Sequence, residues 1–196
     1  MNDPHPSSSS EVHPWEKIRS KEEGSYRIFR VIREWKRCPV SGREFDFYIV
    51  DSPDWVNVIA LTPDQQIVLI EQYRHASEEI ELEIPGGIID DNDTSPVETG
   101  VRELREETGF EGEDAQELVR FRPNPAMIRN WCHVILVKNC RRVHSTHFDE
   151  TEWIATRLVP IEEIPNLIAS NQITNAMVLA ALYHFDVWRR AQSQRR

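Results

Sequence analysis

Three acidic residues, Glu103, Glu106 and Glu107, follow one another at helical spacing and have the side chains best suited to chemistry in this chain. On a helix they fall within little more than one turn, so their carboxylates converge on one side. Converging carboxylate oxygens are the ligands that Mg²⁺ or Mn²⁺ selects, and Mg²⁺ usually adds water and substrate phosphates to a few carboxylates. The glutamates also repel one another at i,i+3 and i,i+4 spacing, which a bound cation would relieve. The alternative is a solvated helix face in which glutamate serves only its helix propensity.

The helix that would carry these carboxylates has clear ends in the sequence. Ser95 can cap it, Pro96 suits its first position, and Glu98 can close a capping box. Gly109 is a typical stop. Gly100, inside the helix, costs about 1 kcal/mol relative to alanine and indicates the close approach of another element, with neutral drift as the alternative. The predicted packing face, opposite the glutamates, consists of Val97, Val101, Leu104 and Thr108.

The composition is that of an ordinary globular chain of 196 residues with a formal net charge of -10. Nucleic acid is not favoured as a partner, because duplex binding starts from a basic patch. A phosphate ester would have to be held by divalent cations or by local arginines. No apolar run approaches the roughly 20 residues of a membrane helix, and the N-terminus lacks a secretory pattern. We therefore expect a cytoplasmic protein with no membrane partner and with reduced thiols at Cys38, Cys132 and Cys140.

The order of strands and helices is predicted from turn residues and apolar patterns. Residues 1–14, which include four consecutive serines, have little to bury and are expected to be a disordered tail. A hairpin is expected across residues 38–42, and a helix pair is expected to close the chain at 161–170 and 175–190. Runs of aromatic and β-branched residues predict strands at 26–32, 44–50, 55–61, 67–73, 127–137 and 153–159. Residues 81–87 are expected to form a short strand broken by a proline and two glycines.

Residues 87–110 resemble a Nudix box, whose pattern is Gly, five residues, Glu, seven residues, then Arg-Glu-aliphatic-any-Glu-Glu-any-Gly-aliphatic. The second half matches in full as Arg102-Glu103-Leu104-Arg105-Glu106-Glu107-Thr108-Gly109-Phe110. In the first half, Asp93 stands where the pattern has its first glutamate, and one extra residue separates it from Arg102. Glu98, four residues before Arg102, is the candidate to replace the family's glutamate–arginine contact.

The resemblance implies a role for each polar residue of the box. Glu103 and Glu107 would be the principal ligands of Mg²⁺ or Mn²⁺, and Glu106 an additional ligand. The carbonyl of Gly86 would be a backbone ligand. Arg102 would act in catalysis by orienting the carboxylates, without touching substrate.

Beyond the box, residues 67–74, 82–87 and 173–176 resemble the ADP-ribose and nucleoside-diphosphate-sugar pyrophosphatases of the same family. This likeness implies that Arg74 and Glu83 bind substrate, with a surface salt bridge as the alternative for Arg74.

A late loop, residues 148–154, resembles the loop that carries the general base in that branch. Glu150 is accordingly the candidate base and Glu152 a further metal ligand, with a merely acidic turn as the alternative. Trp35 and Phe47 are candidates to stack on the base of the substrate, with core packing as the alternative.

The resemblance as a whole implies an α+β protein in which residues 53–196 form a Nudix-type α/β/α sandwich around a mixed sheet. Residues 15–52 would form a small N-terminal β subdomain, which in that branch helps to make a homodimer. The implied reaction is metal-dependent hydrolysis of ADP-ribose or a related nucleotide sugar to a nucleoside monophosphate and a sugar phosphate. The alternatives are a Nudix hydrolase of a dinucleoside polyphosphate or free nucleotide, and a nucleotide-sensing domain without catalysis.

Overall fold

The computed structural model describes residues 11–90, 92–148 and 153–194. Contacts divide the chain into two compact units, Met1–Ser52 with Asn124–Arg129 and Pro53–Pro123 with Asn130–Arg196. The first unit therefore takes in a short segment from the middle of the chain as well as the N-terminal residues. The predicted boundaries, residues 15–52 and 53–196, remain predictions.

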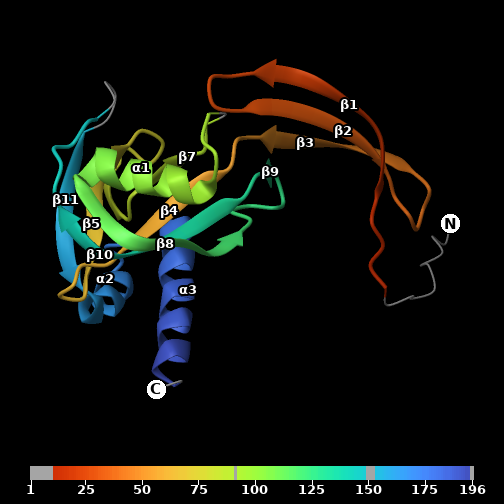
Figure 1. The fold of residues 1–196 in the computed structure, drawn as a ribbon. Coiled ribbons are helices and arrows are strands. Elements are labelled where there is room, and N and C mark those ends of the chain that lie inside the picture. Colours follow the sequence, from red (N-terminus) through yellow and green to blue (C-terminus); the bar gives the residue numbers. More distant parts are fainter. Residues whose placement is uncertain (1–10, 91, 149–152, 195–196) are drawn as a thin grey trace. The chain divides into compact units, whose positions relative to one another are not determined.

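The first unit is a four-stranded sheet in the order β1–β2–β3–β9 (Figure 1). Its strands are β1 (Glu16–Ser25), β2 (Arg30–Arg37), β3 (Glu44–Asp51) and β9 (Ile128–Arg129). The hairpin expected across residues 38–42 joins β2 to β3, with Gly42 at a φ of 68°. The strand expected at 26–32 is wrong in its bounds, because the N–H of Tyr26 donates to the carbonyl of Phe29 at 2.8 Å and closes the turn between β1 and β2.

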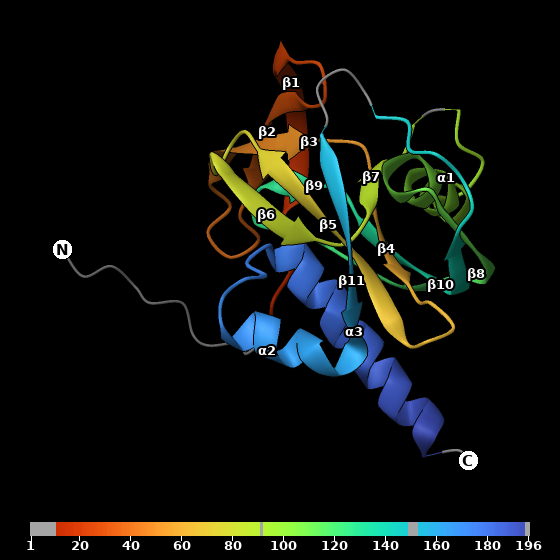
Figure 2. The same ribbon diagram turned by 90° about the vertical axis from the view of Figure 1, so that its left-hand side faces the viewer.

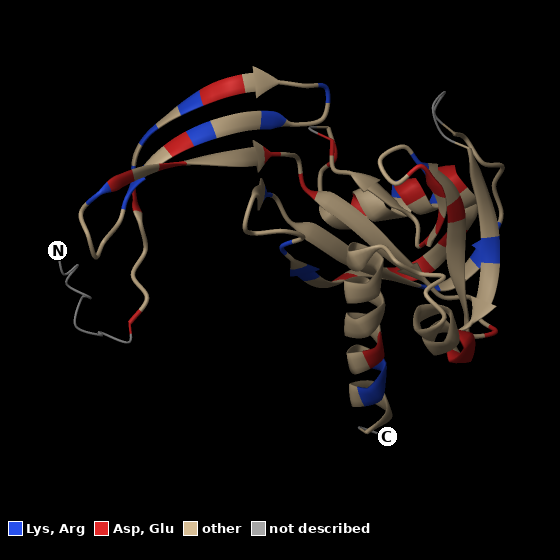
Figure 3. Ribbon diagram, turned by 180° about the vertical axis from the view of Figure 1, so that it is seen from behind, with Lys and Arg blue, Asp and Glu red and all other residues tan. Residues whose placement is uncertain are grey.

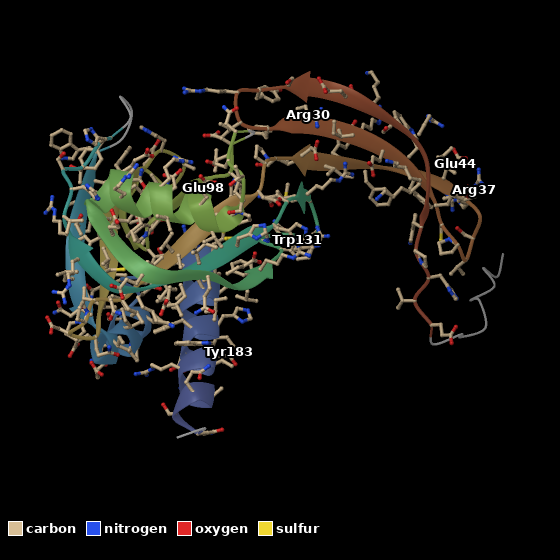
Figure 4. The ribbon with its side chains drawn as sticks, in the orientation of Figure 1. Arg30, Arg37, Glu44, Glu98, Trp131 and Tyr183 are labelled. Atoms are coloured by element: carbon tan, nitrogen blue, oxygen red, sulfur yellow. The ribbon has the colours of Figure 1, made fainter. Side chains whose placement is uncertain are left out.

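Ion pairs hold this sheet together. Arg37 and Glu44, labelled in Figure 4, pair at 3.1 Å beside the β2–β3 turn. Glu34 is 2% exposed and pairs with Arg129 at 2.6 Å, which fastens β9 into the unit. Burial raises the pKa of Glu34, but hydrogen bonds from Arg129 and Lys36 outweigh it and hold that pKa below its ordinary value. The buried carboxylate is thus paired, as a stable interior requires.

The second unit contains two sheets and the helices (Figures 1 and 2). One sheet has the order β7–β4–β10–β8 and is mixed, because β4 and β10 are parallel. The other, β11–β5–β6, is antiparallel. None of the described helices is both long and apolar enough to cross a bilayer. The strands are β4 (Trp55–Ala60), β5 (Gln66–Arg74), β6 (Glu79–Glu83), β7 (Gly86–Ile88), β8 (Phe110–Phe121), β10 (Cys132–Arg142) and β11 (Ile154–Pro160), and the helices are α1 (Pro96–Thr108), η1 (Ile161–Glu163), α2 (Ile164–Ala169) and α3 (Ala176–Ser193).

Both faces of the β4–β10 pair are buried. Val58 and Ile135 pack with Leu104 of α1 in one core. Ile59 and Leu136, the next residues along each strand, pack in a second core with residues of α2 and α3. Successive side chains of a strand point to opposite faces, so α1 covers one face of the sheet and α2 and α3 cover the other. This arrangement confirms the α/β/α sandwich, and it explains the unbroken apolar run at residues 134–137, since a strand buried on both faces has no polar side.

The strands differ from the expected ones in three segments. The segment 110–121 was not expected to form a strand, yet it is β8, the longest described strand of the sandwich. The break expected at 81–87 is present, at Ile84 and Pro85, but the two parts, β6 and β7, lie in different sheets. The strand expected at 127–137 is divided between β9 and β10, and β10 continues to Arg142.

Helix α1 begins and ends where the sequence predicts. The Ser95 hydroxyl accepts a hydrogen bond from the N–H of Glu98 at 3.2 Å. Gly109 has a φ of 74° and its N–H donates to the carbonyl of Arg105. The second half of the predicted capping box is different, because the Glu98 carboxylate accepts from the N–H of Thr94 at 3.3 Å instead of from Ser95.

Gly100 of α1 lies against Ile135 of the sheet. A Cβ atom added there would lie 2.8 Å from Cγ1 of Ile135, a fully buried side chain. The close approach predicted from the sequence is therefore confirmed.

We expect Gly100→Ala to destabilise the protein even though alanine favours helices. Overpacking in a dense core costs about 1–3 kcal/mol, which exceeds the roughly 1 kcal/mol of helix propensity that alanine supplies. Urea denaturation should give a free energy of unfolding lower than wild type by up to about 2 kcal/mol. Arg105→Ala, at an exposed position of the same helix, is the control and should change little. A rise in stability for Gly100→Ala would contradict the proposed steric conflict.

Candidate active site

Arg102 joins acidic side chains from the helix and from the loop before it. Its Nη1 lies 3.0 Å from Oε1 of Glu103 and 2.9 Å from Oε2 of Glu106. Its Nη2 lies 3.2 Å from Oδ2 of Asp93 and 3.9 Å from Oδ2 of Asp90. One guanidinium thus compensates several carboxylates on and beside α1, where Figure 3 shows acidic and basic residues together.

The partner of Arg102 in the loop is Asp93, and the predicted pairing with Glu98 is wrong. Both Nε and Nη2 of Arg102 face the Asp93 carboxylate, at 3.4 and 3.2 Å. Glu98 instead accepts hydrogen bonds from the backbone N–H and the hydroxyl of Thr94. The loop with the extra residue closes on itself through Thr94 and Glu98, so Asp93 keeps the contact despite its shorter side chain.

Glu107 is a buried carboxylate, only 4% exposed. Its Oε2 accepts a hydrogen bond from the N–H of Gly86 at 3.0 Å. It shares the buried side of α1 with Leu104 and Thr108, so the predicted separation of packing and acidic faces is wrong for this residue. A buried carboxylate is costly unless it is partnered, so the solvated-face alternative does not apply to Glu107.

The two glycines of β7 allow the strand to lie against these carboxylates. A Cβ atom added to Gly87 would lie 2.5 Å from Oε1 of Glu103. A Cβ atom added to Gly86 would lie 2.2 Å from the carbonyl oxygen of Val56. A larger residue at Gly86 would force β7 away from β4, whereas one at Gly87 would displace the Glu103 carboxylate.

The oxygen-rich side chains of α1 fit a hard cation such as Mg²⁺. Across residues 11–90, 92–148 and 153–194, no three acidic, histidine or cysteine groups already converge in metal-binding geometry. We attribute this to Arg102, which draws Glu103 and Glu106 toward itself and balances their charge. Mg²⁺ keeps several waters and needs few protein ligands, so Glu107 with Glu103 or Glu106 is a sufficient set of donors.

Two residues predicted to bind substrate, Arg74 and Glu83, pair with each other. Nε and Nη2 of Arg74 face the two oxygens of Glu83 at 2.8 and 2.9 Å. The Glu83 side chain is 4% exposed and that of Arg74 is 44% exposed. The salt bridge named as the alternative for Arg74 is therefore present, and Glu83 holds the arginine at the end of β5.

The other two predicted substrate residues, Trp35 and Phe47, lie on opposite faces of the first unit's sheet. Phe47 is paired with Glu34, whereas Trp35 is paired with Asp46, and paired residues share a face. The guanidinium of Arg19 lies 4.2 Å from the centre of the Trp35 ring. The two aromatic rings of one chain therefore cannot stack together on the same base.

Glu150 and Glu152 lie outside the described residues. The described flanks of their loop are anchored on the second unit, because the N–H of His147 donates to the carbonyl of Glu106 at 2.9 Å and Ile154 pairs with Gln72 of β5.

Some site features could not be found by reading the sequence. The backbone contact between His147 and Glu106 has no local signal. The contacts of Gly87 with Glu103 and of Asp93 with Arg102 did have a signal in the sequence, because Gly87 and Asp93 both occupy positions of the box pattern.

Comparisons with known proteins agree with the fold and the acidic helix. A family model described as the NUDIX domain matches residues 52–182. The chain is 30% identical to the "Methanol dehydrogenase activator" of Bacillus methanolicus, over 71% of this chain and 75% of that protein. It is 27% identical to an "ADP-ribose pyrophosphatase" of Bacillus subtilis (75% and 80% covered) and 28% identical to one of Mycobacterium tuberculosis (87% and 82% covered).

A solved structure, "Crystal structure of ADP compounds hydrolase", superposes with a TM-score of 0.82 at 21% identity and covers 94% of this chain and 98% of its own. At that identity the likeness shows the fold. The matched domain and the two relatives named ADP-ribose pyrophosphatase identify the chain as a pyrophosphohydrolase enzyme. Because the domain model matches more than half of the chain, the protein belongs to the Nudix hydrolase family.

We expect Asp93→Asn to lower stability at neutral pH and to lose this effect in acid. Burial raises the pKa of Asp93, but hydrogen bonds from Arg102 and from the backbone of Asp90 outweigh it and hold the pKa below its ordinary value. A depressed pKa stabilises the fold above the unfolded-state pKa, and this contribution disappears as pH falls through the folded-state pKa. The free energy of unfolding should drop by about 1–2 kcal/mol at pH 7, with the difference shrinking steadily below about pH 4.

Asp64→Asn, in an exposed turn, is the matched control and should change the free energy of unfolding at pH 7 little. A loss for Asp93→Asn that is equally large at pH 7 and pH 3 would show that charge pairing with Arg102 is not its cause.

Proposed function

We propose that the protein hydrolyses the diphosphate bond of ADP-ribose or a related nucleoside-diphosphate sugar, giving a nucleoside monophosphate and a sugar phosphate. The observation that carries the proposal is the buried Glu107 carboxylate, held by the N–H of Gly86 beside the remaining box glutamates. The choice of substrate is supported by the two relatives named ADP-ribose pyrophosphatase. It is also supported by the pairing of Arg74 with Glu83, the two residues that the same branch assigns to substrate.

The metal site would consist of Glu103, Glu106 and Glu107 with the carbonyl of Gly86. A bound Mg²⁺ or Mn²⁺ would supply charge stabilisation for the diphosphate and would activate water for attack on phosphorus. Arg102 positions Glu103 and Glu106 from the opposite side through its contacts at 3.0 and 2.9 Å.

The remaining roles fall to residues around the helix. Arg74, held by Glu83, would use its exposed surface to contact a substrate phosphate or ribose. Glu150 would be the general base that takes a proton from the attacking water, and Glu152 a further metal ligand. The loop that carries both is tied to the end of α1 by the bond between His147 and Glu106.

The first unit is proposed to support a homodimer, as in the branch that the chain resembles. Trp35 or Phe47, but not both from one chain, would then stack on the base of the substrate, because the two side chains occupy opposite faces of their sheet. The small β subdomain and the hydrolase domain keep the proposed boundaries of 15–52 and 53–196.

A substrate panel tests this function. We expect ADP-ribose or another nucleoside-diphosphate sugar to show a kcat/KM at least about tenfold above that of any nucleoside triphosphate or dinucleoside polyphosphate. The panel is assayed with Mg²⁺ by coupled phosphate release, and product chromatography identifies the bond that is cut. Activity should vanish in excess chelator and return with Mg²⁺ or Mn²⁺, because the substrate's charge needs a cation in so acidic a protein.

Each part of the panel can fail by itself. A triphosphate ranked first would contradict the substrate assignment and leave the family assignment intact. Full turnover in excess chelator would contradict the metal mechanism. Absence of turnover on every member, with metal present, would favour a nucleotide-sensing domain.

A further inference from the structure

A tryptophan and two arginines form a cluster at the end of β8 and the start of β10, away from the box glutamates. We call Arg120, Arg122 and Trp131 the Trp131 cluster; Trp131 is labelled in Figure 4. The guanidinium carbon of Arg122 lies 4.0 Å from the centre of the indole ring, and that of Arg120 lies 4.6 Å from it. Both distances are within the range of a cation–π contact, so the ring holds both cations in place.

The backbone of Trp131 is fixed by hydrogen bonds. Its N–H donates to Oδ1 of Asp54 at 2.7 Å, and its carbonyl accepts from the N–H of Trp55 at 2.9 Å. The arginines therefore rest on a platform that is tied to β4. A guanidinium that is already restrained loses less conformational entropy when it binds a ligand.

Neither arginine of the cluster has a carboxylate within 4.0 Å among the described residues, in contrast to Arg74 and Arg102. Two nearby acidic side chains contact His133: Oδ2 of Asp54, the residue before β4, lies 3.5 Å from its Nε2, and Oε1 of Glu117 in β8 lies 3.2 Å from its Nδ1. Within the described part of the chain, the donors of both guanidiniums are thus not used in ion pairs. In a chain with a net charge of -10, two such neighbouring cations form a local reversal of charge.

The Trp131 cluster is separate from the metal-binding helix face. Across the sheet, Arg120 of β8 pairs with His133, His133 with Val56, and Val56 with Gly87 of β7. Three strand spacings separate β8 from β7, a distance of about 14 Å. Because Glu103 lies against Gly87 at the far end of this row, the arginines belong to a different surface.

We propose that the Trp131 cluster binds a dianionic phosphomonoester. Two guanidinium groups, held on one ring and without acidic partners among the described residues, supply several N–H donors for phosphate oxygens. The ligand is either inorganic phosphate or the phosphate of a nucleoside monophosphate, whose base would stack on a guanidinium plane. This site does not require that the protein cleave ADP-ribose.

Isothermal titration calorimetry on the full chain tests the site without divalent metal, using inorganic phosphate, AMP, ribose 5-phosphate and adenosine as probes. We expect a phosphomonoester to bind wild type and the double variant Arg120→Gln/Arg122→Gln to bind it at least about tenfold more weakly, with wild-type binding weakening as salt is raised. Arg141→Gln, which removes an exposed arginine near the other end of β10, is the matched control and should bind as wild type.

The probes and a second variant separate the outcomes. Equal affinity for phosphate and AMP would show that the site recognises only the phosphate. Tighter binding of AMP would show that the nucleoside also contributes to binding. Trp131→Leu keeps both charges and the backbone bonds, and should fall between wild type and the double variant. The proposal is overturned if no phosphomonoester binds, if adenosine binds as tightly as AMP, or if the folded double variant binds like wild type.

Discussion

Repulsion among the carboxylates of α1 is the constraint on which the site depends. Glu103, Glu106 and Glu107 lie on two adjacent turns, and the helix tolerates them because their charges are compensated from two sides. Arg102 faces Glu103 and Glu106, while the N–H of Gly86 faces Glu107. The same carboxylates are the proposed metal ligands. Arg102, the N–H of Gly86 and a bound cation would therefore interact with one set of oxygens. The arginine holds the site together before metal arrives.

Placing this helix requires that glycine backbones lie unusually close to two side chains. Gly100 lets α1 lie on Ile135 of β10, and Gly87 lets β7 lie against Glu103. Leu104 fills the core beneath, with α2 and α3 packed on the opposite face of the sheet. The burial of Glu107 follows from this geometry, because the strand that supplies the Gly86 N–H also shields the carboxylate from water. Fold and site are therefore determined by the same contacts.

Local signals allowed the bounds of α1 to be predicted, because the Ser95 cap and the Gly109 stop depend on residues close to them in the sequence. The edge strand β8 was missed because Phe110–Phe121 is rich in acidic residues and lacks a buried strand's apolar run. The box pattern indicated position 93, but whether Asp93 or Glu98 pairs with Arg102 depended on how the loop absorbs one extra residue, which propensity does not determine. The opposite orientations of Trp35 and Phe47 depended on the register of β2 and β3, and only the pairing of the strands reveals it.

Titration with Mn²⁺ of wild type, Glu107→Gln and Glu150→Gln tests most directly whether the box glutamates form a metal site. Glu107→Gln keeps the size of the side chain and removes one charge, so it should raise the Kd for Mn²⁺ by at least about tenfold and lower kcat at saturating metal. Glu150→Gln, as the control, should lower kcat and leave the Kd unchanged, because a base acts on water after the metal has bound. A folded Glu107→Gln protein with wild-type Kd and kcat would contradict the metal site.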